Sequence, residues 1–195
     1  MGLTLTETAA LLGRLRYIEL LGFELLGSWV PITSHINAKN LLAEQCQHHA
    51  WHAELLGDRF PGAYVFDLER SVQLAEQALS GVAAALSGAS TTIARLAGWY
   101  RVVVPAKIAV YHRWLTVANP VAESPVQRSL RLVLHDESAD WQAGETLLRD
   151  LVGSSGDLQE AFAQQIRVET ALLDCGNLAG SIDLSNVQAF RVWAS

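Results

Sequence analysis

Signals that start and stop α-helices recur along the whole chain, whereas strand patterns are almost absent. Near the start, Thr4 and Glu7 have the spacing of a capping box, in which a hydroxyl and a carboxylate each accept from a free backbone amide. Later starts carry a polar capping side chain, and later stops carry glycine or proline just after an apolar-periodic run. The capping side chains are Ser34, Asp67, Ser124 and Asp157, and the stops are Pro31, Gly57, Gly88, Pro120 and Gly153. This pattern predicts an all-α protein.

These signals divide the chain into four long helices and two further ones. We expect bundle helices over about residues 5–29, 35–57, 91–118 and 125–151, a crossover helix over about 68–87 and a C-terminal helix over about 158–175. Pro105 removes one backbone hydrogen bond and is expected to kink the third bundle helix. The last residues are expected to pack as an extended arm. No low-complexity linker interrupts the series, so we expect one domain over residues 1–195.

The four long helices form two pairs with a long connection between the pairs. Short links join the helices within each pair, so these partners should be antiparallel neighbours. The segment between Gly57 and Ser90 is long enough to carry the chain back to the other end of a bundle. The sequence therefore predicts a four-helix bundle with one long crossover that contains a short helix, and with an additional C-terminal helix.

The composition argues against several classes of protein. The net charge is −6 and the sequence has no basic stripe, so it predicts no positively charged surface that would bind nucleic acid. The cleanest apolar run, residues 102–110, contains Pro105 and Lys107 and is far shorter than the roughly 20 residues that span a membrane. The first residues lack the basic start of a signal peptide. We therefore expect a cytoplasmic protein that binds neither a membrane nor nucleic acid.

Three of the six histidines lie within the run His48-His49-Ala50-Trp51-His52, inside a predicted helix. Neutral imidazole is the commonest protein metal ligand. Residues three or four apart share a helix face, so His52 can converge on one ligand with either His48 or His49. The alternative is that His49 is a core histidine bonded to a buried partner, while the other two are partly solvated.

The two helix pairs are related by an equal spacing of residues that carry charge or imidazole. In bundles with this connectivity, each pair can supply one carboxylate from its first helix and a Glu-x-x-His set from its second. Thirty residues separate Glu19 from His49, and thirty separate Lys107 from Glu137. Aligned in this way, Glu19 corresponds to Lys107 and His49 corresponds to Glu137. We expect all four side chains to converge on the bundle axis.

This alignment defines a candidate metal site. A complete di-iron site of this kind has four carboxylates and two histidines. Here a histidine and a lysine replace two of the glutamates, and an aspartate replaces one histidine. A cationic lysine repels a nearby metal ion and can itself replace one, so these changes argue against a di-iron centre. The expected metal ligands are Glu19, His49, His52, Glu137 and Asp140, and the expected charge partner or proton donor is Lys107.

Two alternatives to a di-iron centre remain open. One is a mononuclear iron or manganese site formed by His49, His52 and either Glu19 or Glu137. The other is a metal-free polar network that holds the bundle in register. Asp136 offers a further carboxylate close to this region.

Two segments resemble ferritin-like proteins of actinobacteria. One is HAWHAELLGDRFP at residues 49–61, and the other is LHDE at residues 134–137 followed by DW at 140–141 and GE at 144–145. The resemblance covers these two helices and otherwise only the order of the helices. It implies a ferritin-like fold. In the wider superfamily, inward carboxylates and histidines bind a di-iron or di-manganese centre that activates oxygen or stores iron.

Two functional hypotheses follow from these observations. The first is a ferritin-like protein with a remodelled or degenerate metal site, acting as an iron- or manganese-dependent oxidoreductase. The second is a metal-free helical bundle that holds a small apolar molecule or a partner helix against its aromatic residues. Whether the protein is an enzyme stays open at this point. The apolar composition is compatible with a homodimer, and the altered ligand set argues against an iron-storage cage.

Overall fold

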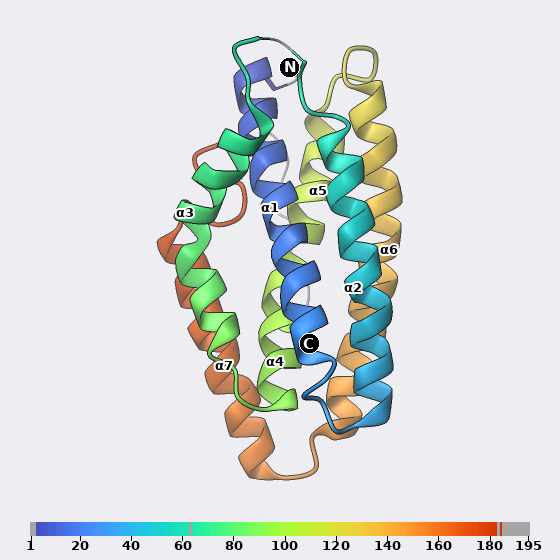
Figure 1. Ribbon diagram of the computed structural model, residues 1–195, viewed down its shortest axis with the longest axis vertical. Helices are drawn as coiled ribbons and strands as arrows, with labels where there is room; N and C mark the ends of the chain where they lie inside the picture. The colour runs from blue at the N-terminus through green and yellow to red at the C-terminus, as the bar shows by residue number, and fades with distance from the viewer. Residues whose placement is uncertain (1–2, 63, 183, 185–195) are drawn as a thin grey trace.

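The computed structural model describes residues 3–62, 64–182 and 184, and its regular elements are helices (Figure 1). No strand occurs in this part of the chain, which confirms the all-α prediction. The long helices are α1 (Leu5–Trp29), α2 (Ile36–Gly57), α3 (Leu68–Ser87), α6 (Ser124–Leu151) and α7 (Ser155–Asp174). Between α3 and α6 the chain passes through α4 (Thr92–Gly98), the π-helical segment η1 (Trp99–Val103) and α5 (Val104–Val117).

The helices run up and down along one long axis (Figure 1). α1 and α2 are antiparallel neighbours, and α3 returns along α1 from the end of α2 to the start of α4. The line α4–η1–α5 therefore runs parallel to α2 and antiparallel to α1. α6 packs against both α2 and α5, and α7 packs against α4 and α3. This arrangement places α1, α2, α5 and α6 around one interior.

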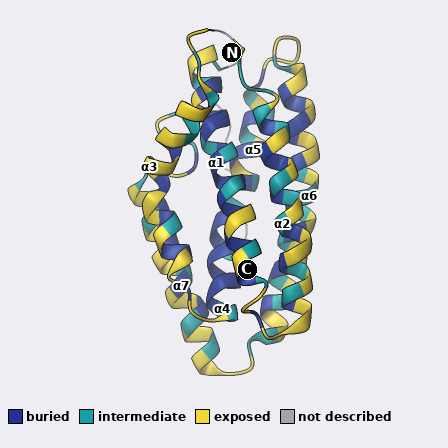
Figure 2. Ribbon diagram, in the orientation of Figure 1, coloured by how far each residue is buried: buried dark blue, intermediate teal, exposed yellow. Residues whose placement is uncertain are grey.

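The helix faces turned toward the interior are buried (Figure 2), and most of their buried side chains are aliphatic or aromatic. α1 contributes a row of fully buried side chains, and η1 and α5 contribute the large aromatic ones. Burying one such side chain stabilises the fold by about 1.5–3 kcal/mol. The rows consist of Leu11, Leu12, Leu15, Ile18 and Leu26 on α1, and of Trp99, Tyr100, Tyr111 and Trp114 on η1 and α5. Among the helices that the structure describes, none combines the length and the hydropathy that crossing a membrane requires.

The residue that caps α1 is the predicted one, whereas the residue that caps α2 is not. Thr4 and Glu7 form the predicted capping box at α1, with the amide of each residue donating to the side chain of the other. At α2 the capping residue is His35 and not the expected Ser34. The amide of Ala38 donates to Nδ1 of His35 at 3.4 Å, because extended backbone at His35 places its ring against the first turn.

The starts of α6 and α7 also differ from the prediction. α6 begins at Ser124, and the preceding Glu123 occupies the cap position without a side-chain capping bond. α7 begins at Ser155, three residues before the expected start, because the hydroxyl of Ser154 accepts from the amide of Asp157. Asp157 therefore lies within the first turn, where its negative charge is favourable.

A π-helical turn stands where the sequence predicts a kink. Pro105 lies in the first turn of α5 and has no N–H to donate to the carbonyl of Arg101, four residues back. Immediately before it, the amide of Val104 donates to the carbonyl of Trp99, five residues back. The wider turn accommodates the missing bond within a helical line from Thr92 to Val117, one residue shorter at each end than the predicted range of 91–118.

The chain after α7 turns back against α1. Gly176 and Gly180 have φ angles of 74° and 62°, a region that glycine adopts without strain. Arg14 on α1 donates to the carbonyls of Asn177 and Leu178 and fixes this turn. The extended arm expected for the last residues falls mainly on 183 and 185–195, outside the described residues.

Candidate functional site

Charged and imidazole side chains from four helices meet inside the bundle. Glu19 comes from α1, His49 and His52 from α2, Lys107 from α5 and Glu137 from α6, and each is at most 1% exposed. We call these five residues the buried cluster. Ligand atoms of its two glutamates and two histidines, one from each residue, all lie within 4.8 Å of one another. The group therefore could hold a metal ion.

The ammonium of Lys107 lies at the centre of the buried cluster. Its Nζ donates to both carboxylate oxygens of Glu19 at 3.0 Å and to Oε1 of Glu137 at 2.5 Å. It also lies 3.3 Å from Nδ1 of His49. The ammonium thus contacts three of the four residues that could bind a metal ion, and it supplies the positive charge that two buried carboxylates require.

Both histidines direct Nδ1 toward a glutamate of the cluster, but their Nε2 atoms have different surroundings. Nδ1 of His49 lies 2.7 Å from Glu19, and Nδ1 of His52 lies 3.2 Å from Glu137. Nε2 of His52 lies 3.3 Å from the carboxylate of Asp136, whose side chain is 27% exposed. Nε2 of His49 is buried and has no hydrogen-bond partner among the described residues. His52 therefore connects the cluster with a carboxylate near the surface.

Burial and charge pairing together set the protonation of the cluster. Burial alone raises the pKa of Glu19, but the ammonium of Lys107 and hydrogen bonds from both histidines hold this pKa well below its usual value. Burial alone lowers the pKa of Lys107, and the carboxylates of Glu137 and Glu19 outweigh it and raise this pKa. Burial likewise lowers the pKa of His52, while bonds to the same carboxylates raise it to about 10. Without metal, these shifts favour the charged forms of Glu19, Lys107 and His52.

Aromatic side chains cover the cluster from η1 and α5. The hydroxyl of Tyr111 donates to a cluster carboxylate. The ring of Trp99 lies with its centroid 5.5 Å from Nζ of Lys107 and packs edge-on against the ring of His49 at 5.2 Å. Gly22 permits this packing, because a Cβ there would lie 2.8 Å from Cζ2 of Trp99. The aromatic side chains exclude water and so strengthen the charge interactions.

Two ligand-type atoms of the cluster lack a hydrogen-bond partner within the described part of the chain. They are Nε2 of His49 and Oε2 of Glu137. Buried polar atoms in folded proteins are almost always paired, and leaving one unpaired costs about 1–3 kcal/mol. An unpaired carboxylate oxygen at this position is a free donor for a cation. The donor set of two imidazoles and two carboxylates fits a divalent transition metal.

No family model, curated protein or solved structure matches this chain. The resemblance of residues 49–61 and 134–145 to ferritin-like proteins therefore has no family match to confirm it. The geometry does not depend on that resemblance. It consists of a helical bundle with a buried group of two glutamates and two histidines that could bind a metal ion.

The structure brings five of the six predicted site residues together, and Asp140 is the exception. Its Oδ2 lies 2.9 Å from Nδ1 of His48, and its backbone carbonyl accepts from the side chain of Gln45. Asp140 does not belong to the group of mutually close ligand atoms. The alignment of the two helix pairs makes Asp140 the counterpart of His52 and predicts it as a metal ligand, whereas in the structure its carboxylate contacts His48.

Sequence analysis missed two contributors to the site. Tyr111 lies four residues after Lys107 and shares its helix face, so this spacing could have assigned it to the cluster. From the sequence, Asp136 is only a further carboxylate close to this region. Its contact with His52 depends on how closely α2 approaches α6, and no pattern within one helix reports that distance.

Proposed function

We propose that this protein is a ferritin-like oxidoreductase that binds one iron or manganese ion at Glu19, His49, His52 and Glu137. The observation that carries the proposal is the convergence of four ligating side chains from three helices, all buried and within 4.8 Å of one another. Polar side chains at this depth are costly unless they bind one another or a cation.

The dimensions of the group suit a single ion. Ligand bonds of roughly 2.0–2.2 Å, as in zinc sites, place opposite ligands about 4 Å apart. The largest separation of 4.8 Å therefore closes with small movements of the side chains. Oε2 of Glu137, which has no partner among the described residues, offers an additional ligand atom.

Lys107 argues for one ion rather than two. Its ammonium neutralises Glu19 and Glu137 from a central position, and two cations at that spacing repel each other. For a metal ion to bind, His52 has to release its extra proton, and Nζ has to move away from at least one carboxylate, which its flexible four-carbon stem permits. After that movement, the ammonium takes the charge position that a second metal ion would occupy.

A bound iron or manganese ion would supply redox chemistry. The residues of the chain set the conditions around it. Nζ of Lys107 holds a proton beside the carboxylate that it still contacts, and we assign it the role of proton donor. Tyr111 holds Glu19 in place, and Trp99 keeps bulk water away from the cluster.

Metal analysis of protein purified without a histidine tag tests this proposal. We expect about one equivalent of iron or manganese per chain, lost in His49→Ala because a ligand is removed. The matched control is His135→Ala, which removes an exposed imidazole of α6 outside the group and should retain the metal. Absence of metal, together with thermal stability that a chelator leaves unchanged, would contradict the proposal. The cluster would then be a metal-free network, in which Lys107 and His52 alone balance the carboxylates.

A further inference from the structure

Packed side chains close the buried cluster on several sides. Trp99 and Tyr111 cover it from η1 and α5, and both are fully buried. On α1, Gly22 lies so close to Trp99 that even a methyl group would not fit. A hydrated cation could pass these sides only by displacing large aromatic side chains from the core.

The seam between α2 and α6 is different, because polar side chains lead inward along it. His48 is 34% exposed and lies 2.9 Å from Asp140, which is 8% exposed. Asp136 is 27% exposed and lies 3.3 Å from the fully buried His52. His52 in turn lies 3.2 Å from Glu137. Carboxylate and imidazole atoms thus extend from the surface of the seam to the cluster.

We propose that a divalent cation reaches the buried cluster through this seam, past His48, Asp140 and Asp136 and then past His52. The inference rests on the proposed metal-binding function. A cation that loses its hydration water needs replacement ligands on the way in, and these side chains provide them at short spacing. The partly exposed carboxylate of Asp136 at the mouth also raises the local concentration of cations. The unpartnered Oε2 of Glu137 lies at the inner end.

The same side chains also join α2 to α6 by ion pairs, and Asp136 orients the ring of His52. These structural roles make different kinetic predictions. Loss of a route slows the association of metal. Loss of ring orientation weakens an existing bond and speeds dissociation.

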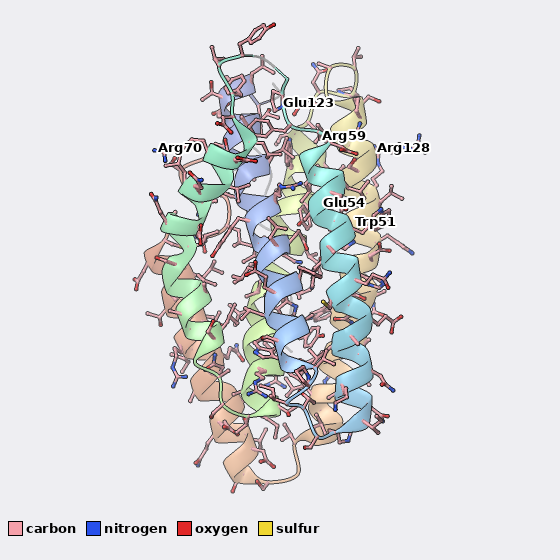
Figure 3. All side chains as sticks on the ribbon, viewed as in Figure 1. Trp51, Glu54, Arg59, Arg70, Glu123 and Arg128 are labelled. Atoms are coloured by element: carbon pink, nitrogen blue, oxygen red, sulfur yellow. The ribbon has the colours of Figure 1, made fainter. Side chains whose placement is uncertain are left out.

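Stopped-flow absorption of Co²⁺ binding to the full-length, metal-free protein separates these roles. The test variant Asp136→Asn/Asp140→Asn removes two charges and preserves side-chain shape. We expect its association rate to fall by about tenfold or more and to lose its dependence on ionic strength. The stoichiometry should stay the same, and the dissociation rate should not rise. The control Glu54→Gln/Glu69→Gln removes the same charge from exposed positions on α2 and α3 and should load like wild type (Figure 3 shows Glu54).

Each outcome decides the proposal. Association of the test variant at the wild-type rate would overturn the route. Faster dissociation with unchanged association would also overturn it and would make Asp136 a positioning residue for His52. If the double variant does not fold, the single variant Asp136→Asn applies the same test at the more exposed carboxylate, with a smaller expected slowing. Wild-type protein that binds no Co²⁺ would overturn the metal-binding function first, and the route with it.

Discussion

Lys107→Met tests how the buried cluster is held together. Methionine fills most of the volume of the lysine stem but carries neither its charge nor its donor hydrogens. The change removes an ammonium that bonds Glu19 at 3.0 Å and Glu137 at 2.5 Å, where all three side chains are fully buried. Only the imidazolium of His52 then remains to balance two carboxylates.

The expected loss of stability follows from this geometry. Removing one partner of a buried ion pair costs about 3–5 kcal/mol. A natural domain is stable by only about 5–15 kcal/mol, so the loss is a large fraction of the total. In a chain of this size, each kcal/mol lowers the melting temperature by roughly 2–4 °C. We therefore expect Lys107→Met to melt roughly 6–20 °C below wild type when no metal is present.

Thermal and urea denaturation of the metal-free proteins measure this effect. Lys39, on α2, is the other lysine of the sequence and is only partly buried. Lys39→Met removes the same charge away from the cluster and should change stability by about 0.5 kcal/mol or less. Wild-type stability in Lys107→Met would refute the reasoning, because the two carboxylates would then not depend on the ammonium.

Metal-free protein should lose stability in alkali, because the pKa of His52 is raised from 6.5 to about 10. The stabilisation that protonated His52 contributes is fully present below pH 6.5 and is lost as the pH rises through about 10. Urea unfolding across this range measures the free energy of unfolding, and His52→Gln should make it depend less on pH. Gly22→Ala should destabilise by about 1–3 kcal/mol, because its Cβ would lie 2.8 Å from Trp99. Gly81→Ala, whose Cβ meets nothing nearer than 4.0 Å, should instead stabilise by about 0.5–1 kcal/mol, and equal denaturation midpoints for the two variants would contradict the packing. Lys107→Glu should melt below wild type without metal and recover with added manganous ion, since it restores a carboxylate; melts that added metal leaves unchanged would count against the metal site.

Local sequence signals determined most of the helix positions. α1 and α3 have the predicted bounds, because capping side chains and apolar periodicity act within a few residues. The errors lie at helix starts that had more than one possible cap. His35 replaces Ser34 at α2 and Ser154 replaces Asp157 at α7, since the choice depends on how the preceding loop enters the first turn.

The sequence also indicated which residues could share the interior. Equal spacing in the two helix pairs grouped Glu19 with Lys107 and His49 with Glu137, because residues at matching positions of packed helices lie at similar depth. It could not indicate what each side chain would bind. Asp140, expected in the same site, lies instead against His48.

Only the tertiary structure decided these partnerships. Lys107 bonds Glu19 across 88 residues of sequence and Glu137 across 30. It also decided that Trp99 can lie against the cluster, because Gly22 on another helix leaves the space. Capping and periodicity act along the backbone over a few residues. Charge pairing, burial and steric fit depend on distance through space, which is set only when the four helices pack together.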